Sequence, residues 1–269
     1  MTSHDVVARV RRLAGTRKVG HAGTLDPMAT GVLVLGLNRA TRLLGHLMLT
    51  EKAYDATIRL GEATTTDDAE GETVSTMSTA GLAEATIRDV LAGFVGEIEQ
   101  VPTAVSAIKV DGKRAYQRVR EGEEVELKAR AVTIHELVVH EVIGDDVRIS
   151  VRCSSGTYIR AIARDLGAAL EVGGHLTALR RTAVGPYDLA VAHSLDDLAD
   201  SFTILPIAEA ARAAFPSLDL DEAQAADVRV GRALELDLPG LTAVFAPGGE
   251  FLALYEPRSG RAKAAAVFV

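Results

Sequence analysis

The sequence predicts an α+β protein, with a mixed and largely antiparallel sheet, flanking helices and a small β-rich domain at the C-terminus. Strand-like segments follow one another without strict interleaving by helices, which disfavours a doubly wound parallel sheet. Short strand-like runs, separated by Pro and Gly, fill the chain after Phe215. A chain of 269 residues is long enough for a large core and a second, smaller domain. We therefore expect a main domain over residues 1–212 and a smaller one over 213–269.

The first elements are predicted from apolar spacing. Apolar residues recur with helical periodicity from Val6 onward, and Ser3 is the expected N-cap of this helix. Gly15 is expected to close it, since glycine adopts the left-handed conformation that ends many helices. A continuous apolar run at 32–36 predicts a strand, and residues 39–48 predict a second helix.

The middle of the chain combines one clear strand with one clear helix. Polar and apolar residues alternate over 54–60, which places Tyr54 and Ile58 on the same strand face. A polar loop rich in Thr and Asp is expected over 62–72. Residues 82–97 then form an amphipathic pattern that predicts a helix with one buried face.

Two further strands and a helix complete the expected main sheet. The strands are predicted at 131–143 and 146–153, with residues 144–145 as the turn of a hairpin. A helix is expected over 159–170, ended by the glycines at 173–174.

The C-terminal part changes in character. Residues 194–214 are rich in Asp and Ala and predict helix, whereas 242–245 and 251–255 predict short strands. This pattern indicates the small β-rich domain.

Composition places the chain among cytoplasmic globular proteins. No apolar run is long enough to cross a bilayer, and no secretory signal precedes the first helix pattern. The lone Cys153 excludes an internal disulfide and is expected to be a small buried residue in a reducing compartment. The scattered His residues and the single Cys provide no clustered metal-ligand spacing.

The net charge of −8 is unevenly distributed, which matters for any polyanionic partner. Residues 1–60 carry nine Lys or Arg against four Asp or Glu, whereas 61–100 carry one against nine and 191–269 carry six against twelve. A nucleic acid requires a local basic surface rather than a basic average. The candidates for such a surface are Arg9, Arg11, Arg12, Arg17, Lys18, Lys109, Lys113, Arg114, Arg118, Arg120, Arg180 and Arg181. Each of them could equally lie on a solvated helix face.

The segment over residues 20–31, GHAGTLDPMATG, holds a single carboxylate among small residues. Pro27 restricts the backbone of Asp26, and three glycines permit tight turns. A carboxylate fixed in this way suits nucleophilic attack on an electrophilic carbon. An Asp that precedes Pro is also common in ordinary turns, so the residues alone leave both interpretations open.

This segment resembles the catalytic-aspartate motif of the TruB family of tRNA pseudouridine synthases. Further stretches resemble that family in the same order along residues 1 to about 190: Lys52-Ala53-Tyr54, Gln100-Val101-Pro102 with Ser106 to Val110, Gly112 to Tyr116, and Cys153 to Arg160 with Leu179-Arg180-Arg181. Because several motifs occur in register, the resemblance is far more specific than any one of them.

The resemblance implies a pseudouridine synthase fold with a C-terminal RNA-binding domain of the PUA type. The implied activity is the isomerisation of uridine 55 in the tRNA T-loop, with tRNA as the partner. It implies no cofactor and no metal. We expect a monomer without an obligate protein partner or membrane contact.

The resemblance also assigns roles to three catalytic residues. Asp26 corresponds to the nucleophile, and the sequence does not tell whether it attacks the ribose C1′, attacks the base C6 or only supports a glycal intermediate. Arg160 corresponds to the arginine that orients this carboxylate and lowers its pKa. Tyr54 corresponds to the tyrosine that stacks on the extruded base and relays the proton leaving carbon 5. From the residues alone, Tyr54 could be a core aromatic and Arg160 a surface arginine at a helix start.

Other matches concern substrate binding. Tyr158 and Leu179 correspond to residues that line the base pocket, and His21 to one that holds the opened T-loop. Asp68 corresponds to an acidic residue of the active-site network, although an ordinary Asx-turn is an equal alternative. The segment 102–130 resembles a mobile RNA-clamping insertion.

Within that insertion, Lys109 and Arg114 are expected to contact phosphates, which positions the RNA without reading its sequence.

The chain departs from the family at its start. Family members usually carry a strand with an Asp-Lys-Pro-x-Gly motif before the helix that begins here at Ser3, and this sequence lacks it. We expect the missing strand to leave a sheet edge unpaired. A tRNA-folding chaperone without turnover and a guide-RNA-dependent synthase subunit are the alternative functions, and the short acidic C-terminal region disfavours the latter.

Overall fold

The structure is a computed structural model that describes residues 1–103, 109–110, 113–114 and 127–269. Within it, the chain divides into two compact units that alternate along the sequence. The first unit contains residues 1–25, 33–48 and 185–269, and the second contains 26–32 and the described part of 49–184. The predicted domain boundary between residues 212 and 213 stays a prediction.

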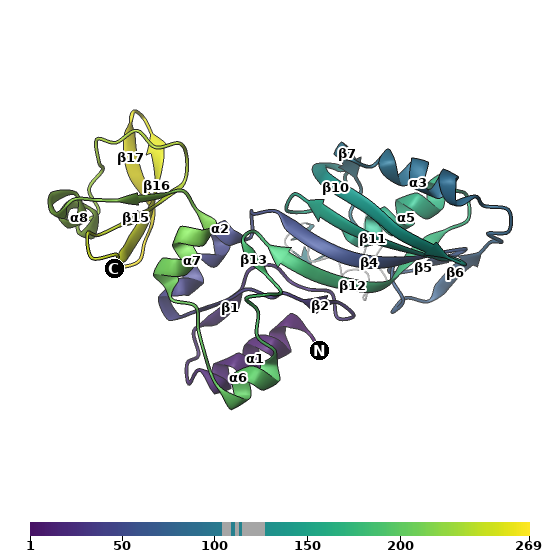
Figure 1. Ribbon diagram of the computed structural model, residues 1–269, viewed down its shortest axis with the longest axis horizontal. Helices are drawn as coiled ribbons and strands as arrows, with labels where there is room; N and C mark the ends of the chain where they lie inside the picture. The colour runs from purple at the N-terminus through teal and green to yellow at the C-terminus, as the bar shows by residue number, and fades with distance from the viewer. Residues whose placement is uncertain (104–108, 111–112, 115–126) are drawn as a thin grey trace. The chain divides into compact units, whose positions relative to one another are not determined.

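The second unit is built on one mixed sheet (Figure 1). Its strands run in the order β12 (Gly174–Val184), β4 (Lys52–Leu60), β11 (Asp146–Cys153), β10 (Arg130–Ile143) and β7 (Gly96–Gln100). Neighbours in this order are antiparallel, whereas the short β2 (Thr30–Gly31) pairs parallel to β12. Helices α5 (Ile159–Ala169) and α3 (Glu84–Ala92) cover one face, and β5 (Glu62–Thr64) with β6 (Thr73–Thr76) forms a hairpin. The expected mixed, largely antiparallel sheet with flanking helices is confirmed.

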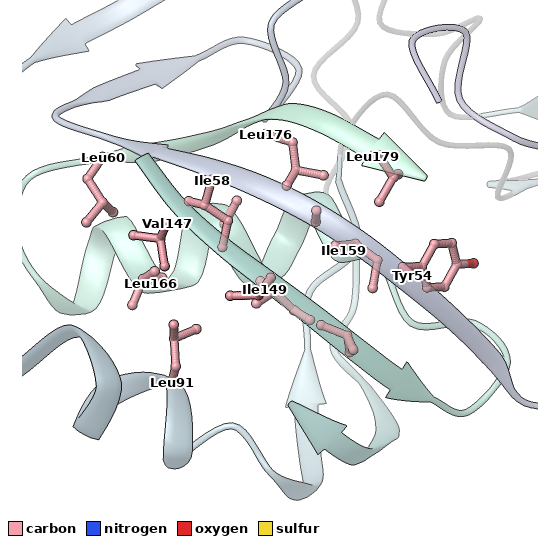
Figure 2. Packing of buried hydrophobic residues seen from close by; sticks show 14 of the residues in the cluster. Tyr54, Ile58, Leu60, Leu91, Val147, Ile149, Ile159, Leu166, Leu176 and Leu179 are labelled. Atoms are coloured by element: carbon pink, nitrogen blue, oxygen red, sulfur yellow. The ribbon is translucent and has the colours of Figure 1, made fainter. Parts of the chain in front are cut away.

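The core of this unit lies between the sheet and its two helices. Along β4 the buried residues alternate as predicted, so Tyr54, Ile58 and Leu60 face the helices. Leu91 of α3 and Leu166 of α5 complete the packing, as Figure 2 shows. Each such aliphatic side chain contributes roughly 1.5–3 kcal/mol on full burial, so the register of β4 is strongly specified.

The first unit contains the N-terminal helix and the C-terminal sheet. Its elements are α1 (Ser3–Leu13), β1 (Val19–His21), β3 (Leu35–Leu37), η1 (Asn38–Arg42), α2 (Leu44–Leu47), β13 (Tyr187–Asp188), α6 (Leu195–Asp200), α7 (Ile207–Ala214), β14 (Ser217–Asp219), α8 (Glu222–Arg229), β15 (Thr242–Phe245), β16 (Phe251–Arg258) and β17 (Arg261–Val267). The last sheet has the order β14-β15-β16-β17. This arrangement confirms a β-rich C-terminal region.

Several predicted boundaries were wrong. Thr2, not Ser3, is the N-cap of α1, because its hydroxyl and the Asp5 carboxylate form a capping box. The strand expected at 32–36 is reduced to Leu35–Leu37, which pairs with β1. The helix expected at 39–48 divides into η1 and α2.

The helix expected over 82–97 ends at its C-cap Gly93 and is followed by β7. No helix in the described part of the chain is long and apolar enough to span a bilayer.

Most of the expected insertion at 102–130 lies outside the described residues, including Arg118 and Arg120. Its described backbone includes β8 (Lys109–Val110) and β9 (Lys113–Arg114), which pair antiparallel.

Candidate active site

Asp26 lies in a loop that is anchored on the edge of the main sheet. The amide of Ala29 donates to the Asp26 carbonyl at 2.9 Å, which closes a tight turn around Pro27. The following residues reach β12, where the Val32 amide donates to the Arg181 carbonyl at 2.8 Å. Gly31 has a φ of 94°, and a Cβ there would lie 2.1 Å from that carbonyl oxygen. Only glycine permits this approach, so Gly31 is required for the aspartate loop to pack against β12.

The Asp26 carboxylate is held by Arg160, the second residue of α5. The arginine Nη2 donates to Oδ1 at 2.9 Å and Nε donates to Oδ2 at 3.1 Å. Arg160 is only 4% exposed, whereas the Asp26 side chain is 31% exposed. A two-point contact of this kind fixes the plane of the carboxylate. The surface-arginine interpretation of Arg160 is therefore wrong.

Arg160 has two further acceptors in the loop before β6. Its Nη1 donates to the Thr66 carbonyl at 2.9 Å and lies 3.4 Å from the Asp68 Oδ2. Asp68 is 3% exposed, and its Oδ1 accepts from the Thr66 hydroxyl and from the Glu70 amide. The Glu70 contact is an Asx-turn, so Asp68 has both the turn geometry and the network position that the sequence left as alternatives.

Tyr54 lies on β4 and is 9% exposed. It is close enough to this cluster for the charge of Asp26 to act on its phenol. Its Cα pairs with that of Arg181 on β12, and the Arg181 guanidinium donates a hydrogen bond to the phenol. Burial raises the pKa of Tyr54 to about 12, although the positive charge of Arg181 opposes this shift. Figure 2 shows Tyr54 at the end of the core cluster, with its phenolic oxygen pointing away from the other labelled side chains. Leu179 packs in the same cluster, two residues before Arg181.

Arg181 was assigned to a possible RNA-binding surface, and that interpretation is wrong. It is 1% exposed, and its Nε donates to the Val32 carbonyl at 2.8 Å. Burial lowers its pKa, while the nearby Tyr54 and Asp26 oppose that shift. The two-residue spacing from Leu179 places both on one strand face, which is the sequence signal that could have identified its burial. The adjacent Arg180 is exposed.

Lys52 is a second buried cation near Tyr54 that sequence reasoning missed. It is 9% exposed, and its Nζ donates to the Thr50 carbonyl at 3.0 Å. Burial and the charge of Arg181 lower its pKa.

Tyr158 is the N-cap of α5, half-buried and extended in backbone conformation. The side chain of Gln100, at the end of β7, accepts from the Tyr158 amide at 2.8 Å and donates to the Tyr158 carbonyl at 3.1 Å. Gln100 is 1% exposed, so these bonds are shielded from water. Its role was not predicted, although it belongs to one of the motifs.

The remaining predicted site residues belong to other elements. His21 ends β1 in the first unit, where its ring contacts that of His4 edge to face at 6.0 Å. Lys109 and Arg114 are paired across the β8–β9 ladder by their backbones. The structure thus brings together Asp26, Arg160 and Asp68 directly, with Tyr54, Leu179 and Tyr158 on adjoining elements of the same unit.

This arrangement can hold a partly exposed carboxylate in one orientation beside a phenol. Two carboxylates share one buried guanidinium, which limits how Asp26 can rotate. Among the described residues, no group of three or more His, Cys, Asp or Glu side chains could hold a metal ion. The chemistry available from these side chains is nucleophilic attack and proton transfer.

Comparisons with known proteins agree with these features. A family model described as TruB family pseudouridylate synthase, N-terminal domain, matches residues 11–159. Models described as tRNA pseudouridylate synthase B C-terminal domain and tRNA pseudouridine synthase II, C-terminal, match 160–213 and 215–269.

Curated relatives and solved structures extend the match to the whole chain. A tRNA pseudouridine synthase B of Arthrobacter sp. strain FB24 is 56% identical and covers 99% of this chain and 92% of the relative. One of Streptomyces griseus is 58% identical, with 99% and 93% covered. A chain in the crystal structure of a Cbf5-Nop10-Gar1 complex superposes with a TM-score of 0.78 at 27% identity, covering 100% of this chain and 82% of that one.

Proposed function

The chain belongs to the TruB family of pseudouridylate synthases, and from this premise we propose that it isomerises uridine 55 in the T-loop of tRNA to pseudouridine. Curated relatives named tRNA pseudouridine synthase B, more than half identical over nearly the whole chain, support tRNA as the substrate. The observation that carries the catalytic part is the Asp26 carboxylate held at two points by the buried Arg160.

The reaction exchanges one glycosidic bond for another. The bond between N1 of the base and C1′ of the ribose breaks, the base turns, and a bond between C5 and C1′ forms. The proton on C5 is lost and N1 becomes protonated, so the reaction needs no net oxidation or reduction. We assign Asp26 as the nucleophile because a positioned carboxylate splits such an exchange into two easier steps.

A uridine in a folded RNA must leave its stack before Asp26 can reach it. We assign the stacking face to Tyr54, since an aromatic ring restores about 1–3 kcal/mol of stacking per base. Leu179 and Tyr158 are the proposed apolar and polar walls for the extruded base. We assign His21, Lys109 and Arg114 to contacts with the surrounding RNA, as the resemblance implies.

The proposal is tested by replacing the nucleophile with its uncharged isostere. Asp26→Asn should abolish tritium release from a T-arm transcript labelled at C5, while RNA affinity changes by less than about tenfold, because the carboxylate contributes to chemistry more than to binding. Asp89→Asn, an exposed substitution on α3, is the matched control and should retain full turnover. Turnover by Asp26→Asn would refute the nucleophile assignment.

The same assay separates the proposed enzyme from a tRNA-folding chaperone. Tritium release by the wild-type chain means isomerisation, whereas tight T-arm binding without release means a chaperone. The approach of two carboxylates to one buried arginine favours the enzyme, because RNA binding alone does not require it.

We further propose that the chain acts as a cytoplasmic monomer without an obligate protein partner. The similar solved chain belongs to a Cbf5-Nop10-Gar1 complex, whereas the curated relatives at more than 50% identity are each described as a single protein, tRNA pseudouridine synthase B. The purified chain alone should therefore modify a tRNA transcript, and a requirement for added protein would contradict this.

A further inference from the structure

Arg181 is a buried cation to which the proposed reaction assigns no role. It lies on the helix-facing side of β12 and is 1% exposed, which excludes contact with an RNA phosphate. Its Nε is anchored on the Val32 carbonyl at 2.8 Å, in the segment that follows the aspartate loop. A buried guanidinium is costly unless hydrogen-bonded, so its location indicates a specific use.

The rest of the guanidinium faces Tyr54. The two residues are Cα partners in the β4–β12 ladder, and the guanidinium donates a hydrogen bond to the phenolic oxygen. Asp26 is the carboxylate whose charge reaches both groups, and Lys52 adds a second positive charge nearby. Because an arginine has no acceptor, the phenol must accept this bond and direct its own proton elsewhere.

We propose that Arg181 is the positioning residue for Tyr54: it fixes the phenolic oxygen and stabilises negative charge on it while the C5 proton is removed. This inference rests on the proposed function. In the step, the C5–H bond breaks, its electron pair re-forms the C5–C6 double bond of the base, and the proton bonds to the phenolic oxygen, while the original hydroxyl proton of Tyr54 passes to water. The guanidinium stabilises the oxygen throughout the exchange because its donor is already in place.

The electrostatics of the site support this role. Burial is the largest cause of the rise in the pKa of Tyr54 to about 12, so the phenol keeps its proton near neutral pH and little phenolate is present. The Arg181 charge acts in the opposite direction on the same group. A neutral residue at position 181 would remove the opposing contribution and leave the penalty of burial unopposed.

The hydrogen bond can be tested without catalysis, because the chain has five tyrosines and no tryptophan. Labelling with 3-fluorotyrosine should give a resolvable fluorine NMR spectrum in which Tyr54→Phe identifies the Tyr54 signal. Arg181→Lys should shift that signal, since lysine lacks the planar fork, whereas Arg180→Met on the exposed neighbouring residue should not. An unshifted Tyr54 signal in folded Arg181→Lys protein would overturn the proposal.

A double-mutant cycle tests the link to chemistry. Single-turnover tritium release should fall about tenfold or more for Arg181→Lys in the wild-type background, and less than about twofold when Tyr54 is already Phe. Equal losses in both backgrounds would mean that Arg181 acts independently of Tyr54 and would overturn the proposal.

The two experiments also distinguish failure of the Arg181 proposal from failure of the proposed isomerase function. If wild-type protein releases no tritium, the proposed function fails, while the fluorine signal still decides whether Arg181 holds Tyr54. Arg181→Met is the more severe variant, and Arg181→Lys keeps the experiment decisive if the former does not fold. Thermal melting monitors folding in every variant.

Discussion

Arg160 lies between two carboxylates whose surroundings differ sharply. Asp68 is 3% exposed and its other oxygen accepts from Thr66 and Glu70, whereas the Asp26 side chain is 31% exposed. A buried guanidinium needs a counter-charge, and Asp68 provides one that is fixed and shielded. Asp26 is then free to face a substrate while its plane remains set by Arg160. The two acids therefore divide into a supporting residue and a reacting residue.

This division predicts the effect of neutralising the supporting acid. Asp68→Asn keeps the shape but removes the charge, and its amide group would face the Arg160 Nη1. We expect kcat to fall about tenfold to a hundredfold with KM changed less than about threefold, because Asp68 is buried and lies against Arg160. Single-turnover and steady-state kinetics measure the two quantities.

The exposed neighbour Glu70 offers the matched control, because its backbone amide but not its side chain contacts Asp68. Glu70→Gln should leave kcat unchanged. A rise in KM alone for Asp68→Asn would place Asp68 in RNA binding instead.

Individual residues of the site were predictable where a motif marked them. Asp26, Arg160 and Asp68 were selected from their motifs, and the structure brings their side chains together. Gln100 and Arg181 were recognised as motif members but not as buried polar groups. Their burial depends on partners 58 and 149 residues away in sequence, which no local pattern reveals.

At the scale of elements, the side-chain amide of Gln100 joins the end of β7 to the start of α5. Gln100 pairs with both backbone groups of Tyr158 as a strand neighbour would, and Arg164 of α5 donates to the Val101 carbonyl at 2.7 Å. These contacts fasten the N-terminal turn of α5, which carries Arg160, to the strand that leads into the 102–130 segment. The orientation of Arg160 thus depends on the position of β7.

The amide contact predicts a pH-dependent defect in Gln100→Glu. Near pH 7 the introduced carboxylate cannot donate to the Tyr158 carbonyl, and we expect a loss of about 1–3 kcal/mol in the free energy of unfolding. Burial raises the pKa of such a carboxyl, and its protonated form regains a donor. The deficit relative to wild type should therefore shrink as pH falls from about 7 to about 5.

Denaturant unfolding at several pH values measures this deficit. Glu99→Gln, at the preceding exposed position of β7, controls for a change of charge there. A deficit that stays constant or grows with falling pH would contradict the proposed pairing.

Helices and strands could be predicted where their buried residues recur with a regular helical or strand spacing. The strands β4, β10 and β11 and the helix α5 were located within two residues because their apolar alternation or helical spacing is regular. Strand β12 was missed because its inward face carries Arg181 and because register shifts at Leu176/Ala178 and Arg181/Ala183 interrupt the apolar alternation. The apolar run at 32–36 was mistaken for a longer strand because continuous apolar runs have no period to test.

At the scale of the whole molecule, the α+β class and the β-rich C-terminal region were predictable, but the composition of the compact units was not. Residues 1–25 and 33–48 join residues 185–269 in the first unit, so the chain passes between units several times. Leu43 and Leu47, for example, belong to the same buried cluster as Phe245 and Phe268. Such long-range packing is set by tertiary contacts, and composition shifts along the chain do not mark it.

Both units contain buried groups that release a proton only at alkaline pH, which predicts how stability depends on pH. Burial raises the pKa of Cys153 to about 11 and that of Tyr54 and Tyr187 to about 12. The unfolded chain loses these protons earlier, from its ordinary values of 9.0 for Cys and 10.0 for Tyr. Stability from these groups is thus complete below about pH 9 and declines as pH rises toward 12, because the unfolded state then binds fewer protons.

Tyr187→Phe tests this expectation in the first unit. The variant should be less stable than wild type at pH 8, by about 1 kcal/mol, because the Ala210 carbonyl loses its hydrogen bond from the phenol. Between about pH 10 and 12, however, its apparent melting temperature should decline less steeply than that of wild type, since one proton fewer is released on unfolding. Circular dichroism melts across this range measure both slopes. Parallel slopes for the two proteins would mean that Tyr187 titrates alike in the folded and unfolded chains, and that its burial does not hold the proton in place.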